Sequence, residues 1–276
     1  MENAEILERL NATVKFIKSV MDFEPEIGIV LGSGLGNFSN EIEILKELSY
    51  EEIPNFPRVT VKGHTGRLIL GKVSGKNVLA LSGRFHYYEG YNMEDVVFPV
   101  RLMKLLGCHS VIISNASGGI KPGQEVGDVM IITDHINLQP EHPLRGPNIE
   151  ELGPRFPDML NAYHSDYIAI AERIAKENNI RCDKGVYVGV QGPTFETPAE
   201  YKAFHIMGGD AVGMSTVPEV IAARHCGLKV FGISVISDCG YPPEAMEDIS
   251  HDMVLAAASN AEPKMTTIIK GLLKEI

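Results

Sequence analysis

The stretch that decides the fold is MEDVVFPVRLMKLLGCHSVIISNASGGIKPGQEVGDVMIIT, residues 93–133. Asn92 is placed to cap a helix over residues 93–106. Val111–Ser114 and Val129–Thr133 follow as short runs rich in valine and isoleucine, which are typical of strands buried on both faces. A helix followed by such strands predicts an α/β fold, in which helices cover a central sheet.

The same alternation extends in both directions along the chain. Apolar residues recur at helical spacing over residues 5–21, and Ile27–Leu31 is a short apolar strand that enters a glycine loop. In the second half, residues 159–177 and residues 250–275 are predicted as helices, the second interrupted near Pro263.

Two neighbouring segments show that the sheet is mixed. Arg67–Val73 and Asn77–Leu81 are predicted strands joined by the turn Ser74-Gly75, which makes them antiparallel. Residues 1–276 contain no long linker, repeat or low-complexity segment. We therefore predict a single α/β domain over residues 1–276, with a central mixed β-sheet flanked by helices.

Composition and charge exclude several classes of partner. The 276 residues carry a formal charge of 25 − 36 = −11, with 44% hydrophobic residues. Polymeric phosphates select basic faces, so we expect no nucleic acid and no membrane as partner. The start MENAEILERL lacks a secretion signal, and the four cysteines are far apart. We therefore expect a cytoplasmic protein.

Several familiar motifs fail on inspection. The loop Gly32–Gly36 follows a strand, but its third glycine comes one position too early for dinucleotide binding. Gly118–Gly123 has P-loop glycine spacing, yet glutamine follows where a P-loop needs lysine. Ser215 lacks the second glycine of a nucleophile elbow, and His135 and His142 have no partner at metal spacing. We expect no metal site.

Polar side chains follow five of the predicted strands. Arg84 offers a bidentate fork for phosphate, and His86 adds a donor that Glu89 could orient. Phe195 could stack on a heterocycle, and Glu196 could accept from its ring N–H groups. Each segment alone is also explained by a turn, a surface salt bridge or a helix start. Together they predict a pocket with an anion half and an aromatic-carboxylate half, built from residues 32–36, 82–91, 114–119, 192–197 and 237–238.

Long strings of the sequence resemble the trimeric, low-molecular-mass purine nucleoside phosphorylases. They cover nearly the whole chain in order: GIVLGSGLG (28–36), GHTGRL (63–68), GRFHYYEGY (83–91), SNASGGI (114–120), NLQPEHPLRGPN (137–148), GPTFETPAE (192–200) and DAVGMSTVPEVIAARHCGL (210–228). The resemblance implies a homotrimer that phosphorolyses purine nucleosides in purine salvage, releasing the free base and a pentose 1-phosphate. Phosphate is then a co-substrate, and no cofactor is implied.

The resemblance also assigns roles to residues that match the family's motifs. It implies a phosphate site made of Ser33, His64, Arg84, His86, Ala116 and Ser215. It implies a nucleoside site made of Tyr88, Phe156, Phe195, Glu196, Val212, Met214, Asp238 and His251, in which Phe156 reaches the neighbouring subunit's site. The residues expected to take part in catalysis are His86, Glu196 and Asp238.

One position departs from the family pattern. Asp238 stands where the family usually has asparagine, which can donate to purine N7 and O6. An ionised aspartate only accepts, whereas a protonated one could donate to N7. Activity on 6-aminopurine nucleosides, adenosine or methylthioadenosine, is therefore an alternative. Glu196 and His251 favour a nucleoside with a free 5′-hydroxyl over methylthioadenosine. A hydrolase and a nucleoside-binding regulator are alternatives from other classes.

Overall fold

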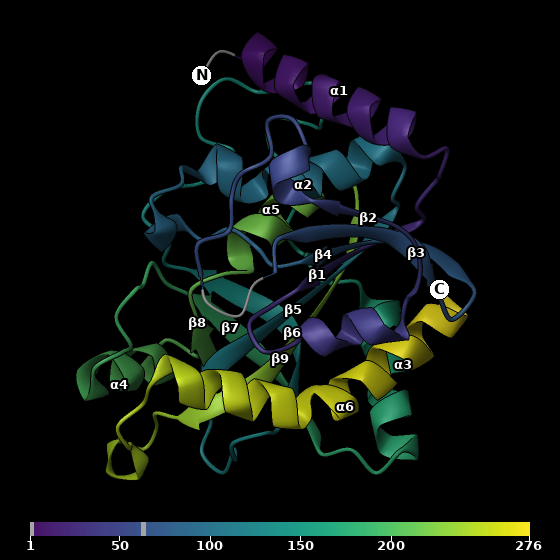
Figure 1. Cartoon of the computed structure of the whole chain (residues 1–276). Coiled ribbons are helices and arrows are strands. Elements are labelled where there is room, and N and C mark those ends of the chain that lie inside the picture. The colour runs from purple at the N-terminus through teal and green to yellow at the C-terminus, as the bar shows by residue number, and fades with distance from the viewer. Residues whose placement is uncertain (1–2, 62–64) are drawn as a thin grey trace.

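The computed structural model describes residues 3–61 and 65–276 of the chain. Within these residues the fold is α/β, with one mixed sheet between two layers of helices (Figure 1). The strands are β1 (Ile27–Leu31), β2 (Glu43–Ser49), β3 (Arg67–Val73), β4 (Lys76–Ser82), β5 (Ser110–Gly119), β6 (Val129–Asn137), β7 (Cys182–Gly189), β8 (Ala211–Gly213) and β9 (Lys229–Cys239). The predicted fold class, a central mixed sheet flanked by helices, is confirmed.

Strand pairing gives the sheet an open half and a closed half. The order is β2-β3-β4-β1-β5-β8-β7-β6-β9, and β9 also pairs with β5. Strands β5, β8, β7, β6 and β9 therefore form a ring, whereas β2 ends the open half. The predicted hairpin is confirmed, since β3 and β4 pair antiparallel with Val73 opposite Lys76.

Helices cover both faces of this sheet (Figure 1). One layer consists of α1 (Asn3–Val20), α2 (Met93–Leu106) and α5 (Val217–His225). The other contains α3 (Ser165–Glu177) and α6 (His251–Glu275), while α4 (Pro198–Ile206) lies beside the closed half. Short 3-10 turns η1 (Gly36–Glu41), η2 (Tyr50–Glu52), η3 (Tyr87–Glu89) and η4 (Pro243–Ala245) complete the chain. No helix within the described residues has the length and apolar character of a membrane span.

The direction of the strands determines where the functional loops meet. Strands β4 and β5 both run parallel to β1, and β9 runs parallel to β5. Their carboxyl ends therefore lie at one edge of the sheet, where loops of an α/β fold bind ligands. The segments that leave β1 and β4 carry Ser33 and Arg84, and Asp238 is the last residue but one of β9. Strand β8 crosses the same edge, since Val212 pairs with Gly118.

Two predicted helices differ from those observed. Helix α3 begins at Ser165 rather than 159, because the backbone N–H of His164 donates to Val230 of β9 at 2.8 Å. Helix α6 continues through Pro263, so the predicted interruption is wrong. Proline removes one hydrogen bond to the carbonyl four residues earlier. That carbonyl belongs to Ser259, and both residues are exposed, so water can satisfy it.

Candidate active site

Most of the predicted site residues line one hollow of about 100 Å³ at the carboxyl edge of the sheet. These are Ser33, Arg84, His86, Tyr88, Ala116, Phe195, Glu196, Val212, Met214, Ser215, Asp238 and His251. The hollow adjoins a second one of about 520 Å³, which shares Phe195, Glu196, Ser237 and Asp238 with it. His64 lies outside the described residues. Arg84, His86 and Ser215 line only the first hollow, whereas Glu196 and Asp238 line both, so the two parts of this space differ in chemistry. We refer to these parts as its two ends.

Arg84 forms the centre of the first end. It follows β4 and is 3% exposed. Its Nη1 donates to Ser215 Oγ at 2.6 Å and to Thr216 Oγ1 at 3.2 Å, and its Nη2 donates to the Ser114 carbonyl at 2.5 Å. Arg84 Nη1 also lies 3.4 Å from the buried carboxylate of Glu219. Because these contacts hold the guanidinium rigidly, its positive charge is preorganised beside the hollow, where it favours an oxyanion.

Ser215 stands just before the N-terminus of α5, where backbone N–H groups and the helix dipole favour an anion. The next residue, Thr216, has φ +70°, a costly conformation for a β-branched side chain. Thr216 Oγ1 accepts from Asn115 at 2.8 Å and from Arg84, and its N–H donates to Glu219 at 2.9 Å. These contacts hold a strained turn that aims Ser215 at the hollow.

The loop after β1 forms another part of the wall of the first hollow. A Cβ on Gly32 would lie 2.7 Å from the Ser114 carbonyl, so only glycine lets this loop approach β5. The N–H of Gly32 donates to Ser114 Oγ at 3.3 Å. This close approach brings Ser33 and Ala116 into the same hollow as Arg84.

His86 is oriented by Glu89. Its Nδ1 and its backbone N–H both lie 2.8 Å from Glu89 Oε1. Burial by itself would raise the pKa of Glu89, but hydrogen bonds from His86 and Thr60 hold this pKa down at about 2. Burial lowers the pKa of His86, which keeps the imidazole neutral at pH 7. The ionised Glu89 selects the Nδ1–H tautomer, so Nε2 is an acceptor suited to a proton of hydrogen phosphate.

Carboxylates dominate the other end. Burial raises the pKa of Glu196 to about 7, and the charge of Asp238 adds to this effect. Asp238 Oδ1 accepts from Ser237 Oγ at 2.7 Å, and its Oδ2 accepts from the Tyr201 hydroxyl at 2.8 Å. Phe195 is 39% exposed and lines both hollows, so its ring can contact a planar ligand. This end suits a heterocycle with polar edges.

Further side chains line the first hollow. Tyr88 stacks on His86 with ring centroids 4.7 Å apart, and burial raises the pKa of its phenol to about 12. Met214 and His251 line the same hollow, together with Val212, which is buried. Aromatic, apolar and imidazole side chains thus line this hollow together with Arg84.

Sequence reasoning missed three residues of this site. Thr216 and Glu219 support Arg84, and Tyr201 supports Asp238. Thr216 and Glu219 stood inside a quoted string, but their pattern indicated only a helix start. Tyr201 immediately follows the string GPTFETPAE, and its partner Asp238 is 37 residues away.

Phe156 is not part of this hollow. Its side chain is 88% exposed and lines a separate hollow with His142 and Arg155. A large apolar side chain with this exposure is available to another chain. Within residues 3–61 and 65–276, no three His, Cys, Asp or Glu side chains gather as a metal-binding group.

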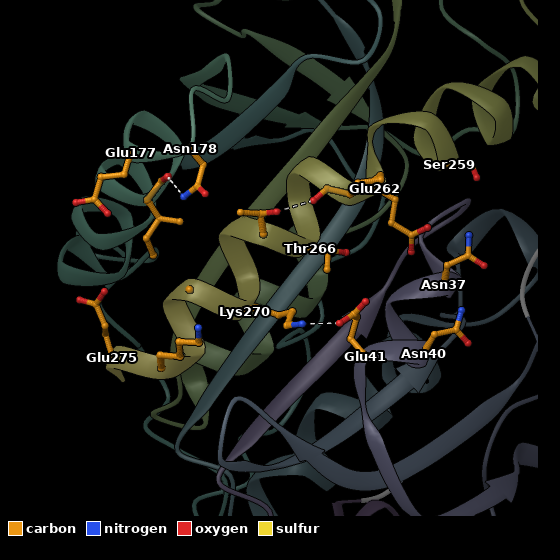
Figure 2. Close-up of a pocket in the computed structure, with 15 residues that line it drawn as sticks. Asn37, Asn40, Glu41, Glu177, Asn178, Ser259, Glu262, Thr266, Lys270 and Glu275 are labelled. Atoms are coloured by element: carbon orange, nitrogen blue, oxygen red, sulfur yellow. Dashed lines mark hydrogen bonds and ion pairs between the residues drawn. The ribbon is translucent and has the colours of Figure 1, made fainter.

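A wider groove of about 760 Å³ lies between α3, α6 and η1 (Figure 2). Figure 2 shows Lys270 of α6 reaching Glu41, with which it forms an ion pair. Four glutamates and two lysines line this groove, an excess of negative charge that disfavours phosphate. Glu262, on the same groove, accepts from the N–H of Phe38 at 2.7 Å and thereby ties η1 to α6. We interpret this groove as structural.

The comparisons with known proteins agree with this geometry. Residues 26–274 match the model of the phosphorylase superfamily. Purine nucleoside phosphorylase 1 of Bacillus subtilis is 48% identical over 268 residues, which are 97% of this chain and 98% of that protein. The chain therefore belongs to the phosphorylase superfamily, among its purine nucleoside phosphorylases.

Solved structures give the same result. Isoform 2 of purine nucleoside phosphorylase from Schistosoma mansoni, in complex with cytosine and ribose-1-phosphate, superimposes with a TM-score of 0.92 at 41% identity. The match covers 98% of this chain and 96% of that one. A Schistosoma purine nucleoside phosphorylase in complex with hypoxanthine gives a TM-score of 0.91 at 39% identity, covering 98% and 97%.

Proposed function

We propose that the chain catalyses the reversible phosphorolysis of inosine, guanosine and their deoxy forms. The products are the free purine base and ribose or deoxyribose 1-phosphate, a reaction of purine salvage. One observation carries the proposal: the Arg84–Ser215 cradle lines the same hollow as the carboxyls of Glu196 and Asp238.

The first end binds phosphate. The guanidinium of Arg84, the hydroxyls of Ser33 and Ser215, and the backbone at Ala116 are the donor types that a phosphate dianion needs. His86 accepts the remaining proton of hydrogen phosphate through Nε2. These groups position the nucleophile beneath the sugar, so that the bimolecular step becomes effectively unimolecular. Phosphate is a co-substrate, and the reaction as written needs no further cofactor.

The second end binds the purine. Phe195 contacts the ring face, and Glu196 accepts the N1–H of a 6-oxopurine. Phosphate is a weak nucleophile toward an intact glycosidic carbon, so the C1′–N9 bond breaks early, through an oxocarbenium-like transition state. Negative charge then builds on the leaving purine, and preorganised polar groups around the base stabilise it. Tyr88, Met214 and His251 hold the ribose, with His251 at its 5′-hydroxyl.

The alternative that Asp238 shifts the preference to 6-aminopurine nucleosides is not favoured. Similar Schistosoma structures hold hypoxanthine or guanosine, which carry a 6-oxopurine, and one holds adenosine, so ligand occupancy in relatives alone does not decide the preference. A panel of nucleosides in saturating phosphate tests the specificity. We expect inosine and guanosine to be turned over faster than adenosine or methylthioadenosine. A higher kcat/KM for methylthioadenosine than for inosine would refute this part of the proposal.

We further propose a homotrimer in which Phe156 reaches the site of the neighbouring subunit. Its exposure and its distance from the hollow of its own chain support this arrangement. A cytoplasmic location is also part of the proposal, and cell fractionation tests it. Light scattering of the purified protein tests the trimer directly.

A further inference from the structure

Tyr201 occupies a position between the two carboxyl groups of the base site. It lies on α4, is 2% exposed, and donates from its hydroxyl to Asp238 Oδ2 at 2.8 Å. The same hydroxyl is also a hydrogen-bond partner of Glu196, which lowers the pKa of that carboxyl, although its single proton can serve only one carboxylate at a time. One phenol therefore contacts both groups that are expected to contact the purine.

The surrounding backbone is shaped to admit this ring. A Cβ on Gly118 of β5 would lie 2.2 Å from the Tyr201 hydroxyl. A Cβ on Gly240, after β9, would lie 2.1 Å from the ring itself. Because real Cβ atoms do not approach so closely, any other residue at either position would displace the phenol. Gly118 of β5 and Gly240 after β9 therefore leave the space in which the Tyr201 ring packs.

The two carboxyl groups have different surroundings. Asp238 accepts hydrogen bonds on both oxygens, from Ser237 and Tyr201, whereas burial raises the pKa of Glu196 to about 7, so Glu196 holds a proton near neutral pH. A 6-oxopurine needs the reverse arrangement. Its N1–H needs an ionised acceptor, and its N7 needs a donor, a role that asparagine could fill directly but ionised Asp238 cannot.

We propose that Tyr201 is a positioning residue that couples Glu196 to Asp238, so that one proton held by this pair moves to Asp238 when the purine binds. The Tyr201 hydroxyl donates to whichever carboxylate is ionised. In the empty site that is Asp238, and in the substrate complex it is Glu196. This inference rests on the proposed phosphorolysis and deepens it.

Each proton that moves in this step has a named donor and acceptor. Glu196 Oε–H gives its proton to Tyr201 Oη, and Tyr201 gives its own proton to Asp238 Oδ2. Asp238 then protonates N7 while the C1′–N9 electron pair moves into the imidazole ring, so the base leaves neutral. The phosphate that attacks C1′ gives its proton to His86 Nε2, from which it passes to solvent. The carboxyl pair takes up one proton from solvent when the base departs.

Both basic and acidic groups lie near the pair, and Arg84, His86 and His251 line the first hollow with it. Of the acidic groups, Glu200 on α4 raises the pKa of Glu196, and Glu247 and Asp248 line the adjoining hollow. These acidic groups favour retention of one proton by the pair. In such a coupled pair the apparent pKa belongs to the pair as a whole. The active enzyme is the singly protonated form, so kcat/KM should fall as the pH rises above about 7.

The test is a double-mutant cycle with Tyr201→Phe and Asp238→Asn, measured with inosine from pH 5 to pH 9. Tyr201→Phe removes the hydrogen-bond donor to the ionised carboxyl pair. We therefore expect the fall of kcat/KM at alkaline pH to begin about one pH unit higher, and kcat to fall about tenfold. In Asp238→Asn we expect the opposite pH dependence, because kcat/KM should rise with pH as Glu196 ionises. Adding Tyr201→Phe to Asp238→Asn should then change kcat at pH 8.5 by less than about twofold.

Tyr241→Phe is the matched control, since it removes a phenol hydroxyl from a ring stacked on His205 of the same helix. Tyr241→Phe should leave the pH dependence of kcat/KM unchanged. Tyr201→Phe could instead lower kcat equally in the unmodified protein and in Asp238→Asn, without shifting the pH dependence of kcat/KM. This result would show that Tyr201 is only structural and would overturn the inference. Absence of phosphate-dependent turnover in the unmodified protein would instead remove the proposed function, and the inference with it.

Discussion

Arg84 Nη1 lies 2.6 Å from Ser215 Oγ, although 131 residues separate them in the sequence. The contact joins the loop after β4 to the N-terminus of α5. It brings a guanidinium fork, a hydroxyl and the positive end of a helix dipole together around one small space. An acidic chain can bind phosphate in this way without a basic surface.

Arg84→Lys should therefore impair the use of phosphate. Lysine keeps the charge but loses the planar fork and the contacts to Ser114 and Thr216. We expect kcat/KM for phosphate to fall by about 100-fold or more, while the KM for inosine changes little. Initial rates at varied phosphate measure this. The control is Arg173→Lys at an exposed ion pair with Glu275, and an Arg84→Lys enzyme with unchanged phosphate kinetics would contradict the assignment.

Glu219→Ala should destabilise the fold. The Glu219 carboxylate, 4% exposed, compensates the buried charge of Arg84 and accepts from the Thr216 N–H. Removing one partner of a buried pair typically costs about 3–5 kcal/mol. Urea unfolding followed by circular dichroism measures the free energy of unfolding. The exposed Glu177→Ala should cost less than about 1 kcal/mol, and an equally small loss for Glu219→Ala would refute the role of this pair.

Glu196 should make stability depend on pH in a defined direction. Its pKa in the folded protein is about 7, above the ordinary value of 4.5. Its contribution is therefore fully present below pH 4.5 and is lost as the pH rises through 7. We expect the free energy of unfolding of Glu196→Gln, relative to the unmodified protein, to rise by about 1–2 kcal/mol between pH 4.5 and pH 8. A difference that stays constant across this range would mean that Glu196 titrates normally.

Phe156→Ala tests the contribution of the neighbouring subunit. If Phe156 closes the site of another protomer, its removal should raise the KM for inosine about tenfold, because the buried contact with the nucleoside is lost. Ile206→Ala, another exposed apolar side chain at the end of α4, should leave the KM unchanged. A monomer in light scattering, with an unaltered KM in Phe156→Ala, would contradict the shared site.

Local patterns were sufficient to predict the main elements of the fold. The Asn92 cap, the hairpin turn at Ser74 and the apolar strands all depend on neighbouring residues, which sequence periodicity reports. The closure of β5–β9 into a ring could not be predicted in this way. Strand β8 has only three residues, and its place is determined by long-range pairing with β5 and β7.

The residues of the candidate site also fall into those that local sequence signals indicate and those that depend on long-range contacts. Ser33, Arg84, Glu196 and Asp238 stand at strand ends or beside a helix start, so topology and family resemblance pointed to them. Thr216 and Tyr201 act through partners that are distant in the sequence, and a threonine or tyrosine near a helix start has no local signal of such a role. Asp238, which departs from the family pattern, was the one hint that its hydrogen-bond partner would matter.

The most direct test of the account is the release of hypoxanthine from inosine by the purified protein, with and without inorganic phosphate. We predict release only with phosphate, together with ribose 1-phosphate in equal amount. Release at the same rate without phosphate would indicate a hydrolase. Tight binding of inosine without turnover in saturating phosphate would indicate a binding protein, and either result would contradict phosphorolysis.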